Sequence, residues 1–181
     1  EATRRAILNA AVDLFDTVGY ADAALTDLMD GSGVGKGAMY YHFRNREEVA
    51  AAVIAEADAK LREATMKAFS DPGQPALAKF IRSVFVTAHL TANDPVIRTG
   101  VKLRNELRTS GSEFAGGPEH RQMCTAAVAA GIAEGDLRAD LDPDQAGHTL
   151  STAILGTHRL CETTGEDLHA RLADVLTLTL R

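Results

Sequence analysis

Side chains that could contact nucleic acid gather in one short segment, KGAMYYHF, which begins at Lys36. A lysine binds phosphates or the acceptor edge of guanine, and the hydroxyl groups of Tyr40 and Tyr41 can reach phosphate oxygens. Met39 and Phe43 lie four residues apart and therefore share one face of a helix, which suits a buried core. We expect the basic and aromatic side chains to project from the remaining surface of that helix, where they could contact DNA.

Two other groups of residues have spacings that could support different chemistry. His158, Cys161 and Glu162 occur at i, i+3 and i+4 and could form part of a metal site, although the sequence offers no distant fourth ligand. Cys124 follows His120 by one helical turn, which would suit a nucleophile and its base. No orienting acid, oxyanion-hole motif, glycine-rich phosphate loop or HExxH sequence accompanies either group. We therefore predict no catalytic residue, no metal site and no cofactor.

The segment Leu25–Phe43, LTDLMDGSGVGKGAMYYHF, predicts two short helices joined by a tight turn. Thr26 is the expected N-cap of the first helix, which would put Met29 at the third helical position and leave no full capping box. The glycines around Ser32 should end this helix. A helix-turn-helix places its second helix in the major groove of DNA. The alternative is a surface helix pair that has no contact with DNA.

Composition indicates an all-helical protein of one domain or two small ones. The 181 residues are 45% hydrophobic and include five prolines and no tryptophan, and strand-like alternation is rare. The sequence contains neither a run of eighteen apolar residues nor a signal-peptide pattern, so we expect a soluble, cytoplasmic protein. The two cysteines form no motif and are expected to be reduced core thiols.

The net charge of −6 argues at first against a DNA-binding protein. Even the first 48 residues carry five Lys and Arg against eight Asp and Glu, a net charge of −3. Placement matters more than the total, because Lys36, Arg44 and Arg46 cluster around the expected reading helix. We expect modest affinity without a dimer and a steep loss of binding with salt. Since the sequence starts at Glu1 rather than at methionine, a preceding arm could add basic residues.

Apolar spacing and turn signals predict seven further helices. Their expected ranges are about 3–17, 45–69, 76–91, 96–107, 118–134, 144–163 and 166–180. Residues 109–118, TSGSEFAGGP, predict a loop that either gates a pocket or simply connects two helices. The last two helices carry more apolar surface than so short a chain can cover, and small residues such as Gly147 and Gly156 permit close helix approach. We therefore expect a four-helix dimer interface.

The first 50 residues or so resemble the DNA-binding domain of the TetR family of bacterial repressors. The residues that carry this resemblance are the helix Arg4–Val18 with Gly19-Tyr20, then Leu25-Thr26, Gly33-Val34, Lys36-Gly37, Tyr40-Tyr41-His42-Phe43 and Arg46-Glu47-Glu48. Gly35 replaces the usual Ser or Thr, and Arg46 replaces a frequent Lys. The resemblance implies a DNA-binding domain over 1–48 and a ligand-binding and dimerisation domain over 49–181. The implied DNA-contacting residues are Thr26, Lys36, Gly37, Tyr40, Tyr41, His42 and Arg46.

The rest of the chain is similar to the γ-butyrolactone receptor group of TetR-type repressors. The similarity rests on the segments Pro95-Val96-Ile97-Arg98, Gly135-Asp136-Leu137, Asp140-Leu141-Asp142, His148-Thr149-Leu150 and Gly156-Thr157. The group places a tryptophan in its ligand pocket at a position that falls on His120 here, so a polar, titratable ring replaces a flat apolar one. A butyrolactone, a related furan or butenolide acid and an antibiotic intermediate are therefore all open as effectors.

These features predict a homodimeric, ligand-responsive repressor that a small molecule releases from a palindromic operator. The long helix over 45–69 would transmit the ligand-induced conformational change to the DNA-binding region. The residues expected to line the ligand pocket are Phe85, His89, Leu103, His120, Met123 and Ile154. Two alternatives stay open, a ligand-independent DNA-binding regulator that binds a protein partner and, from another class, an enzyme on a helical scaffold.

Overall fold

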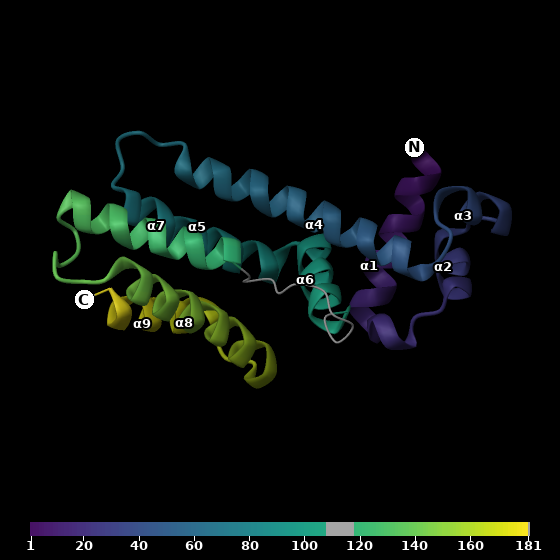
Figure 1. Cartoon of the computed structure of the whole chain (residues 1–181). Coiled ribbons are helices and arrows are strands. Elements are labelled where there is room, and N and C mark those ends of the chain that lie inside the picture. Colours follow the sequence, from purple (N-terminus) through teal and green to yellow (C-terminus); the bar gives the residue numbers. More distant parts are fainter. Residues whose placement is uncertain (108–117, 181) are drawn as a thin grey trace. The chain divides into compact units, whose positions relative to one another are not determined.

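The computed structural model describes residues 1–107 and 118–180, which form helices joined by turns, with no strand among them (Figure 1). This confirms the all-helical prediction. The helices are α1 (Ala2–Asp22), α2 (Leu25–Ser32), α3 (Lys36–His42), α4 (Arg46–Phe69), α5 (Ala76–Asn93), α6 (Pro95–Leu107), α7 (Pro118–Glu134), α8 (Pro143–Thr164) and α9 (Leu168–Thr179). The predicted loop over 109–118 lies, up to residue 117, outside the described residues.

The chain packs into two compact units that do not coincide with the predicted boundary after residue 48. One unit comprises Glu1–Arg62 together with the described part of Leu90–Phe114, and the other comprises Glu63–His89 together with the described part of Ala115–Arg181. We call them the head and the body. Helices α4 and α5 each contribute residues to both units. Helix α6 belongs to the head, although the body residues Glu63–His89 precede it in the chain.

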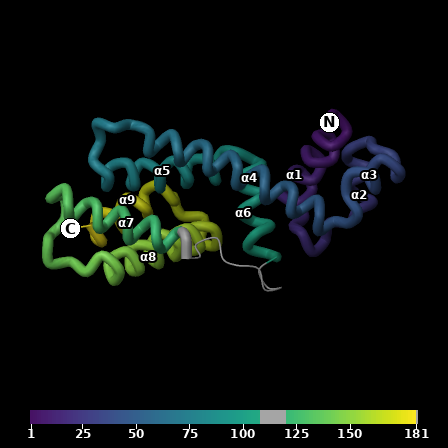
Figure 2. Tube along the Cα trace, turned by 45° about the horizontal axis from the view of Figure 1, so that its top comes forward, coloured from purple at the N-terminus to yellow at the C-terminus, as the bar shows by residue number. Residues whose placement is uncertain are grey.

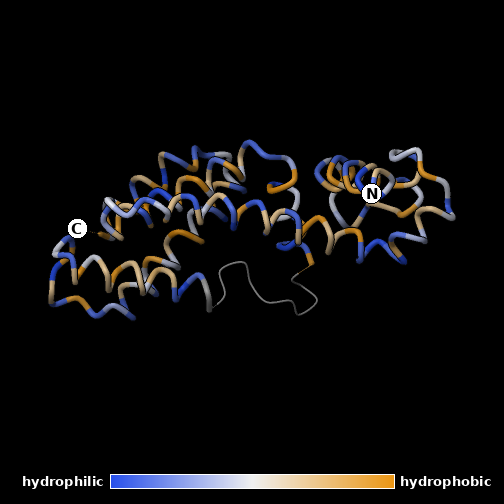
Figure 3. Tube along the Cα trace, turned by 90° about the horizontal axis from the view of Figure 1, so that it is seen from above, coloured by the Kyte–Doolittle hydropathy of each residue, from blue (hydrophilic) through white to orange (hydrophobic). Residues whose placement is uncertain are grey.

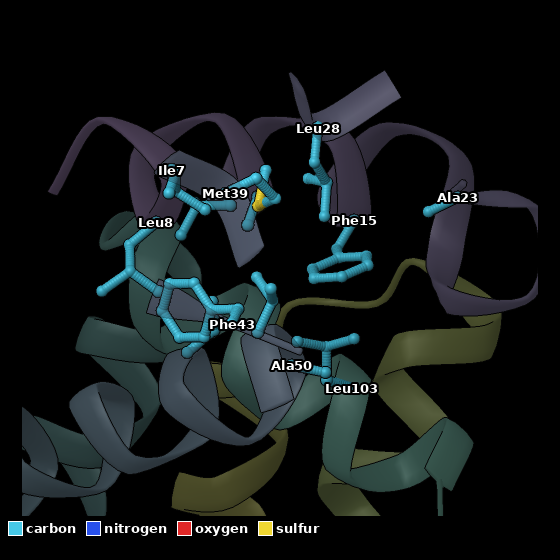
Figure 4. Packing of buried hydrophobic residues seen from close by; sticks show 13 residues of the cluster. Ile7, Leu8, Phe15, Ala23, Leu28, Met39, Phe43, Ala50 and Leu103 are labelled. Atoms are coloured by element: carbon cyan, nitrogen blue, oxygen red, sulfur yellow. The ribbon is translucent and has the colours of Figure 1, made fainter. Parts of the chain in front are cut away.

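The head is organised around a single apolar core to which α1, α2, α3, α4 and α6 all contribute (Figure 4). Phe15 of α1, Leu28 of α2 and Met39 of α3 are fully buried. The buried side chains of α4 and α6 complete it, and they are Val49, Ala50, Val53 and Leu103. Residues beyond the helix-turn-helix therefore form much of the surface against which it packs.

The body has its own core, formed by α5, α7, α8 and α9, which run side by side in Figures 1 and 2. Its buried side chains include Phe80 of α5, Val128 of α7, Leu150 of α8 and Leu172 of α9. Along these helices the colour in Figure 3 alternates between apolar and polar, as expected of helices with one buried face. Gly147 of α8 permits a close approach to α7, because a Cβ built there would lie 2.5 Å from Cα of Thr125.

The start of α2 corrects one prediction about helix capping. The N-cap of α2 is Ala24, not Thr26, and Thr26 is exposed at the second helical position. Asp27 is therefore the third helical residue, and its carboxylate accepts a hydrogen bond from the amide of Ala24 at 3.1 Å. This is half of a capping box, and the acidic residue that supplies it was not recognised because the predicted start of the helix was two residues too late.

Polar side chains of α6 fasten it to α1 within the head. Arg98 binds the carboxylate of Asp16, with 2.9 Å between Nη2 and Oδ2, and Lys102 donates to the backbone carbonyl of Asp16 at 2.8 Å. The hydrogen bonds from Arg98 hold the pKa of Asp16 below its usual value. One turn further along, Glu106 accepts from the amide of Tyr20 at 2.7 Å. Helix α6 therefore holds the carboxyl-terminal half of α1 at several points.

Candidate nucleic-acid interface

Helix α3 has a buried face and an open face, as its sequence predicts. Met39 is fully buried and Phe43, which follows the helix, is 4% exposed. Tyr40 is 47% and Tyr41 85% exposed, although large aromatic side chains are usually well buried in monomers. Lys36 is exposed as well. The anchoring residues hold a short helix whose outer surface presents one ammonium group and two phenols.

The turn between α2 and α3 is built on one left-handed glycine. Gly33 has φ +65°, and the amide of the following Val34 donates to the carbonyl of Met29 at 3.3 Å. Glycine takes this conformation without the steric cost that other residues meet. Gly35 caps α3 without a side-chain hydrogen bond, and neither it nor Gly37 would bring a Cβ within 4 Å of another group. The backbone around Gly37 therefore stays open to a close partner.

Cationic side chains flank the exposed face of α3. The Arg44 side chain, in the link to α4, is 88% exposed, and its Nε lies 4.0 Å from a Glu48 oxygen. Arg4 of α1 lies with its guanidinium carbon 5.4 Å above the ring of Phe43. The sequence placed Arg44 in the cationic cluster around the expected reading helix, although neither Arg44 nor Arg4 was among the predicted DNA-contacting residues. The local cation density offsets the net negative charge of the chain where a duplex would approach.

Of the three other predicted DNA-contacting residues, His42 and Arg46 are half-buried and have partners within the head, whereas Thr26 is exposed. His42 is half-buried, and its ring packs edge-on against Tyr41 with 5.0 Å between centroids. Thr26 is exposed on the first turn of α2. Arg46 is half-buried and donates from Nη1 to the backbone carbonyl oxygens of Tyr20 and Ala23. The geometry groups Lys36, Gly37, Tyr40 and Tyr41 on α3 and leaves Arg46 engaged within the head.

Comparison with known proteins decides which family carries this arrangement. A model described as "Bacterial regulatory proteins, tetR family" matches residues 7–53, and a "Tetracyclin repressor-like, C-terminal domain" model matches residues 74–181. The chain belongs to the TetR family. The resemblance inferred from the sequence is therefore confirmed, and TetR-family proteins of this kind are DNA-binding regulators of transcription.

Relatives of this TetR-family chain include γ-butyrolactone receptors. The A-factor receptor protein of Streptomyces griseus is 30% identical over 64% of the chain. A crystal structure of a γ-butyrolactone receptor (ArpA-like protein) is 30% identical, with a TM-score of 0.75 over 98% of this chain and 85% of that one. CprB of Streptomyces coelicolor, studied in complex with its operator sequence, is 29% identical, with a TM-score of 0.67 over 98% of this chain and 94% of that one. The aligned segments span less than half of the curated relatives' own lengths.

The residues predicted to line a ligand pocket are divided between the two units. Leu103 is 1% exposed in the core of the head, so it is not brought together with the other five, which belong to the body. Phe85 and His89 of α5 both have ring contacts with His169 of α9, with centroids 6.1 and 6.3 Å apart. Sequence reasoning missed His169, because nothing in its spacing links α9 to α5.

A second predicted group lies where α7 meets α8. Nδ1 of His120 lies 2.8 Å from the hydroxyl of Ser151 and 3.9 Å from the sulfur of Cys124. Ile154 is 3% exposed in the core of the body, and Met123 is 37% exposed. Burial raises the pKa of the Cys124 thiol to about 11. Cys124 is therefore a neutral thiol at physiological pH and lacks the thiolate that nucleophilic catalysis requires.

Two half-buried histidines, His120 and His158, predict that the stability of the body depends on pH. Burial lowers the pKa of His120 and of His158, and the neighbouring His158 lowers that of His120 further. Because the unfolded chain then binds protons more readily, the free energy of unfolding should fall as pH drops below the ordinary histidine pKa of 6.5. The loss should end once pH passes below the two lowered histidine pKa values.

Urea unfolding between pH 7.5 and 5 measures this effect. The His158→Gln variant should show a shallower dependence on pH than the parent, because one of the two half-buried imidazoles no longer takes up a proton. His148, which is exposed on α8, provides the matched control, and His148→Gln should keep the parent's slope. Equal slopes in all three proteins would contradict the assignment.

The described residues contain neither a metal-binding cluster nor a helix that could span a membrane. Within 1–107 and 118–180, no three His, Cys, Asp or Glu side chains are grouped closely enough to hold a metal ion. Both cysteines are buried and unpaired with one another. None of the helices in the described part of the chain is both long and apolar enough to cross a membrane.

Proposed function

We propose that this TetR-family chain is a transcriptional repressor that a small molecule releases from a palindromic operator. The observation that carries the proposal is the division of α3 into an anchored face with Met39 and an exposed face with Lys36, Tyr40 and Tyr41. An exposed ammonium group can contact phosphate or guanine, and phenols can contact phosphate, sugar and thymine methyl groups. Relatives of the chain include a protein studied with its operator and receptors named for γ-butyrolactones.

The active form in this proposal is a homodimer that pairs through α8 and α9. Leu160 of α8 is 55% exposed and Leu178 of α9 is 74% exposed, and Gly156 of α8 is exposed with open space above it. Large apolar side chains at the surface of two neighbouring helices favour burial against a second copy. The two heads would then occupy successive major grooves, about one helical turn or slightly more apart.

The effector would bind among the helices of the body. Phe85, His89, His120, Met123 and Ile154 combine apolar surface with imidazole groups, as pockets for small amphipathic molecules do. A butyrolactone, a furan or butenolide acid and an antibiotic intermediate all combine an apolar chain with oxygen acceptors. To release DNA, the effector must bind the DNA-incompetent state more tightly. Helix α4 contributes to both units and would transmit the change.

A mobility-shift experiment tests this function. The DNA upstream of the gene for this protein is titrated with the purified protein, and the complex is then challenged with a synthetic 2-acyl-γ-butyrolactone, a 2-alkylfuran carboxylic acid and extracts of the source organism. We expect a retarded band at low salt that at least one of these additions abolishes. A band that none of them affects would favour the ligand-independent regulator. The absence of any band would contradict the DNA-binding role itself.

The role of α4 has its own test. Spin labels on α3 of both protomers report the distance between the two heads with and without the effector found above. We expect that distance to change when the effector binds. The same distance in both states would contradict transmission through α4.

A further inference from the structure

Arg46 has an unusual set of partners for a residue beside a DNA-reading helix. It is the first residue of α4, it is half-buried, and its Nη1 donates to the carbonyl oxygens of Tyr20 at 2.8 Å and Ala23 at 2.5 Å. The carbonyl oxygen of Ala21 lies 3.3 Å from the same nitrogen. The guanidinium carbon is 4.1 Å from the centroid of the Tyr20 ring. The charge of Arg46 is therefore directed at the backbone of the head itself.

The backbone that Arg46 binds is the corner between α1 and α2, which we define as residues 20–23. Gly19 interrupts α1 with φ +81° and ψ +171°, and Ala23 leaves the helix in an extended conformation. The last carbonyl groups of a helix lack partners within it, and a cation near them is favourable because of the helix dipole. Helix α1 has no basic residue in its own last turn. Arg46 supplies from α4 the cation that α1 lacks.

Tyr20 is held by side chains from two other helices, α4 and α6. Its hydroxyl donates to Glu47 of α4 at 2.9 Å, and its amide donates to Glu106 of α6 at 2.7 Å. Burial, followed by the hydrogen bond to Glu47, raises the pKa of the Tyr20 phenol. A planar guanidinium can stack on this ring and donate to carbonyl groups beside it at the same time, whereas an ammonium group cannot. In this chain the guanidinium group therefore makes a combination of contacts that a lysine at this position would make only in part.

The neighbouring Arg44 provides a contrast within the same link. Its side chain is 88% exposed, and its nearest acidic group, on Glu48, is 4.0 Å away. Both residues were part of the cationic cluster expected to face DNA. The geometry leaves Arg44 available to a phosphate and engages Arg46 with the corner.

We infer that Arg46 is a positioning residue, which fixes the corner Tyr20–Ala23 so that α2 and α3 keep the orientation that reads DNA. The inference rests on the proposed DNA-binding function for its effect on affinity. Helix α2 begins at Leu25, two residues after the last carbonyl that Arg46 binds. Conformational freedom at the corner would therefore change the orientation of α2 and, through the turn at Gly33, the orientation of α3.

The dependence of DNA affinity on salt separates positioning from direct phosphate contact. Fluorescence anisotropy measures binding of the full chain to its labelled upstream DNA across a range of KCl concentrations, for the parent and for Arg46→Lys, Arg46→Ala and Arg44→Ala. A residue that neutralises a phosphate contributes about 0.9 to the slope of log affinity against log salt. Loss of a positioning residue weakens binding and leaves that slope unchanged.

We expect Arg46→Lys to bind about tenfold more weakly than the parent with an unchanged salt slope, even though it keeps the charge. Arg44→Ala should instead reduce the slope. Parent-like affinity in Arg46→Lys, together with a reduced slope in Arg46→Ala, would overturn the inference and make Arg46 a phosphate ligand. Should Arg46→Ala fail to fold, the Lys variant decides alone, because it keeps the aliphatic stem and the charge.

Amide hydrogen exchange without DNA tests the inference independently of the proposed function. Exchange across residues 20–32, which cover the corner and α2, should accelerate at least tenfold in Arg46→Lys and stay at the parent's rate in Arg44→Ala. Unchanged exchange in Arg46→Lys would overturn the positioning role. If the parent bound no DNA, the proposed function would fail, and the exchange rates would still decide whether Arg46 holds the corner.

Discussion

Replacing Lys36 and Tyr40 by alanine should abolish specific DNA binding while leaving the fold intact. Each side chain is exposed on α3, so neither contributes to the core that Met39 anchors. Loss of a phosphate or base contact costs about 1–3 kcal/mol, which is roughly 5- to 150-fold in affinity. In the proposed dimer each substitution removes the contact from both heads. We therefore expect at least a hundredfold loss of operator affinity for the double variant.

Anisotropy with the upstream DNA measures this loss, and circular dichroism and sedimentation check the fold and the oligomeric state. Lys67→Ala is the matched control, because Lys67 is an exposed lysine of the body whose side chain pairs with Glu63. It changes the net charge by the same amount and should leave affinity within about twofold of the parent. Tyr40→Phe separates the hydroxyl from the ring. Parent-like affinity in the double variant would rule out α3 as the reading helix.

Replacing Gly147 by alanine should markedly destabilise the body. The new Cβ would lie 2.5 Å from Cα and 2.6 Å from the amide nitrogen of Thr125, and a helix backbone cannot yield as a flexible side chain does. Overpacking of this kind costs about 1–3 kcal/mol, sometimes more, and the gain from removing a helical glycine offsets only about 0.5–1 kcal/mol. We expect a net loss of roughly 2 kcal/mol.

Thermal unfolding detects such a loss as a decrease in Tm of roughly 4–8 °C for a chain of this size. Gly37→Ala is the control, because a Cβ at this helical glycine meets nothing within 4 Å. It should leave Tm unchanged or raise it slightly. An unchanged Tm in Gly147→Ala would mean that α7 and α8 are further apart in solution than in the structure.

The sequence predicted the features that periodicity and turn chemistry encode. The i, i+4 spacing of Met39 and Phe43 correctly placed the buried side of α3. The helix expected over about 45–69 is α4, and the side chain of Asn45 caps its start by accepting from the amide of Glu48 at 2.8 Å. Thr26 was the wrong cap because a hydroxyl side chain is a strong local signal, whereas the half-box made by Asp27 depends on the exact start of the helix.

Partners distant in sequence were not predictable in the same way. Arg46 binds carbonyl groups 23 to 26 residues earlier in the chain, and backbone acceptors leave no mark in the sequence. Leu103 was expected to line the ligand pocket, but it lies in the core of the head, because periodicity does not reveal which of two cores a helix joins. Contacts between α5 and α9, such as Phe85 with His169, depend in the same way on packing that only the fold specifies.

The core of the head includes side chains from helices beyond the helix-turn-helix, and this limits how such regulators can exchange domains during evolution. Val49, Val53 and Leu103 are almost fully buried there, yet they lie beyond residue 48, and Leu103 lies beyond 27 residues that belong to the body. Burial of each side chain contributes about 1.5–3 kcal/mol, so together they approach the whole stability of a small domain. A single recombination event near residue 48 would join a helix-turn-helix to a foreign α4 and α6 that need not fit it. New pairings of operator and effector should therefore arise more readily by substitution on α3 or in the body than by shuffling of intact halves.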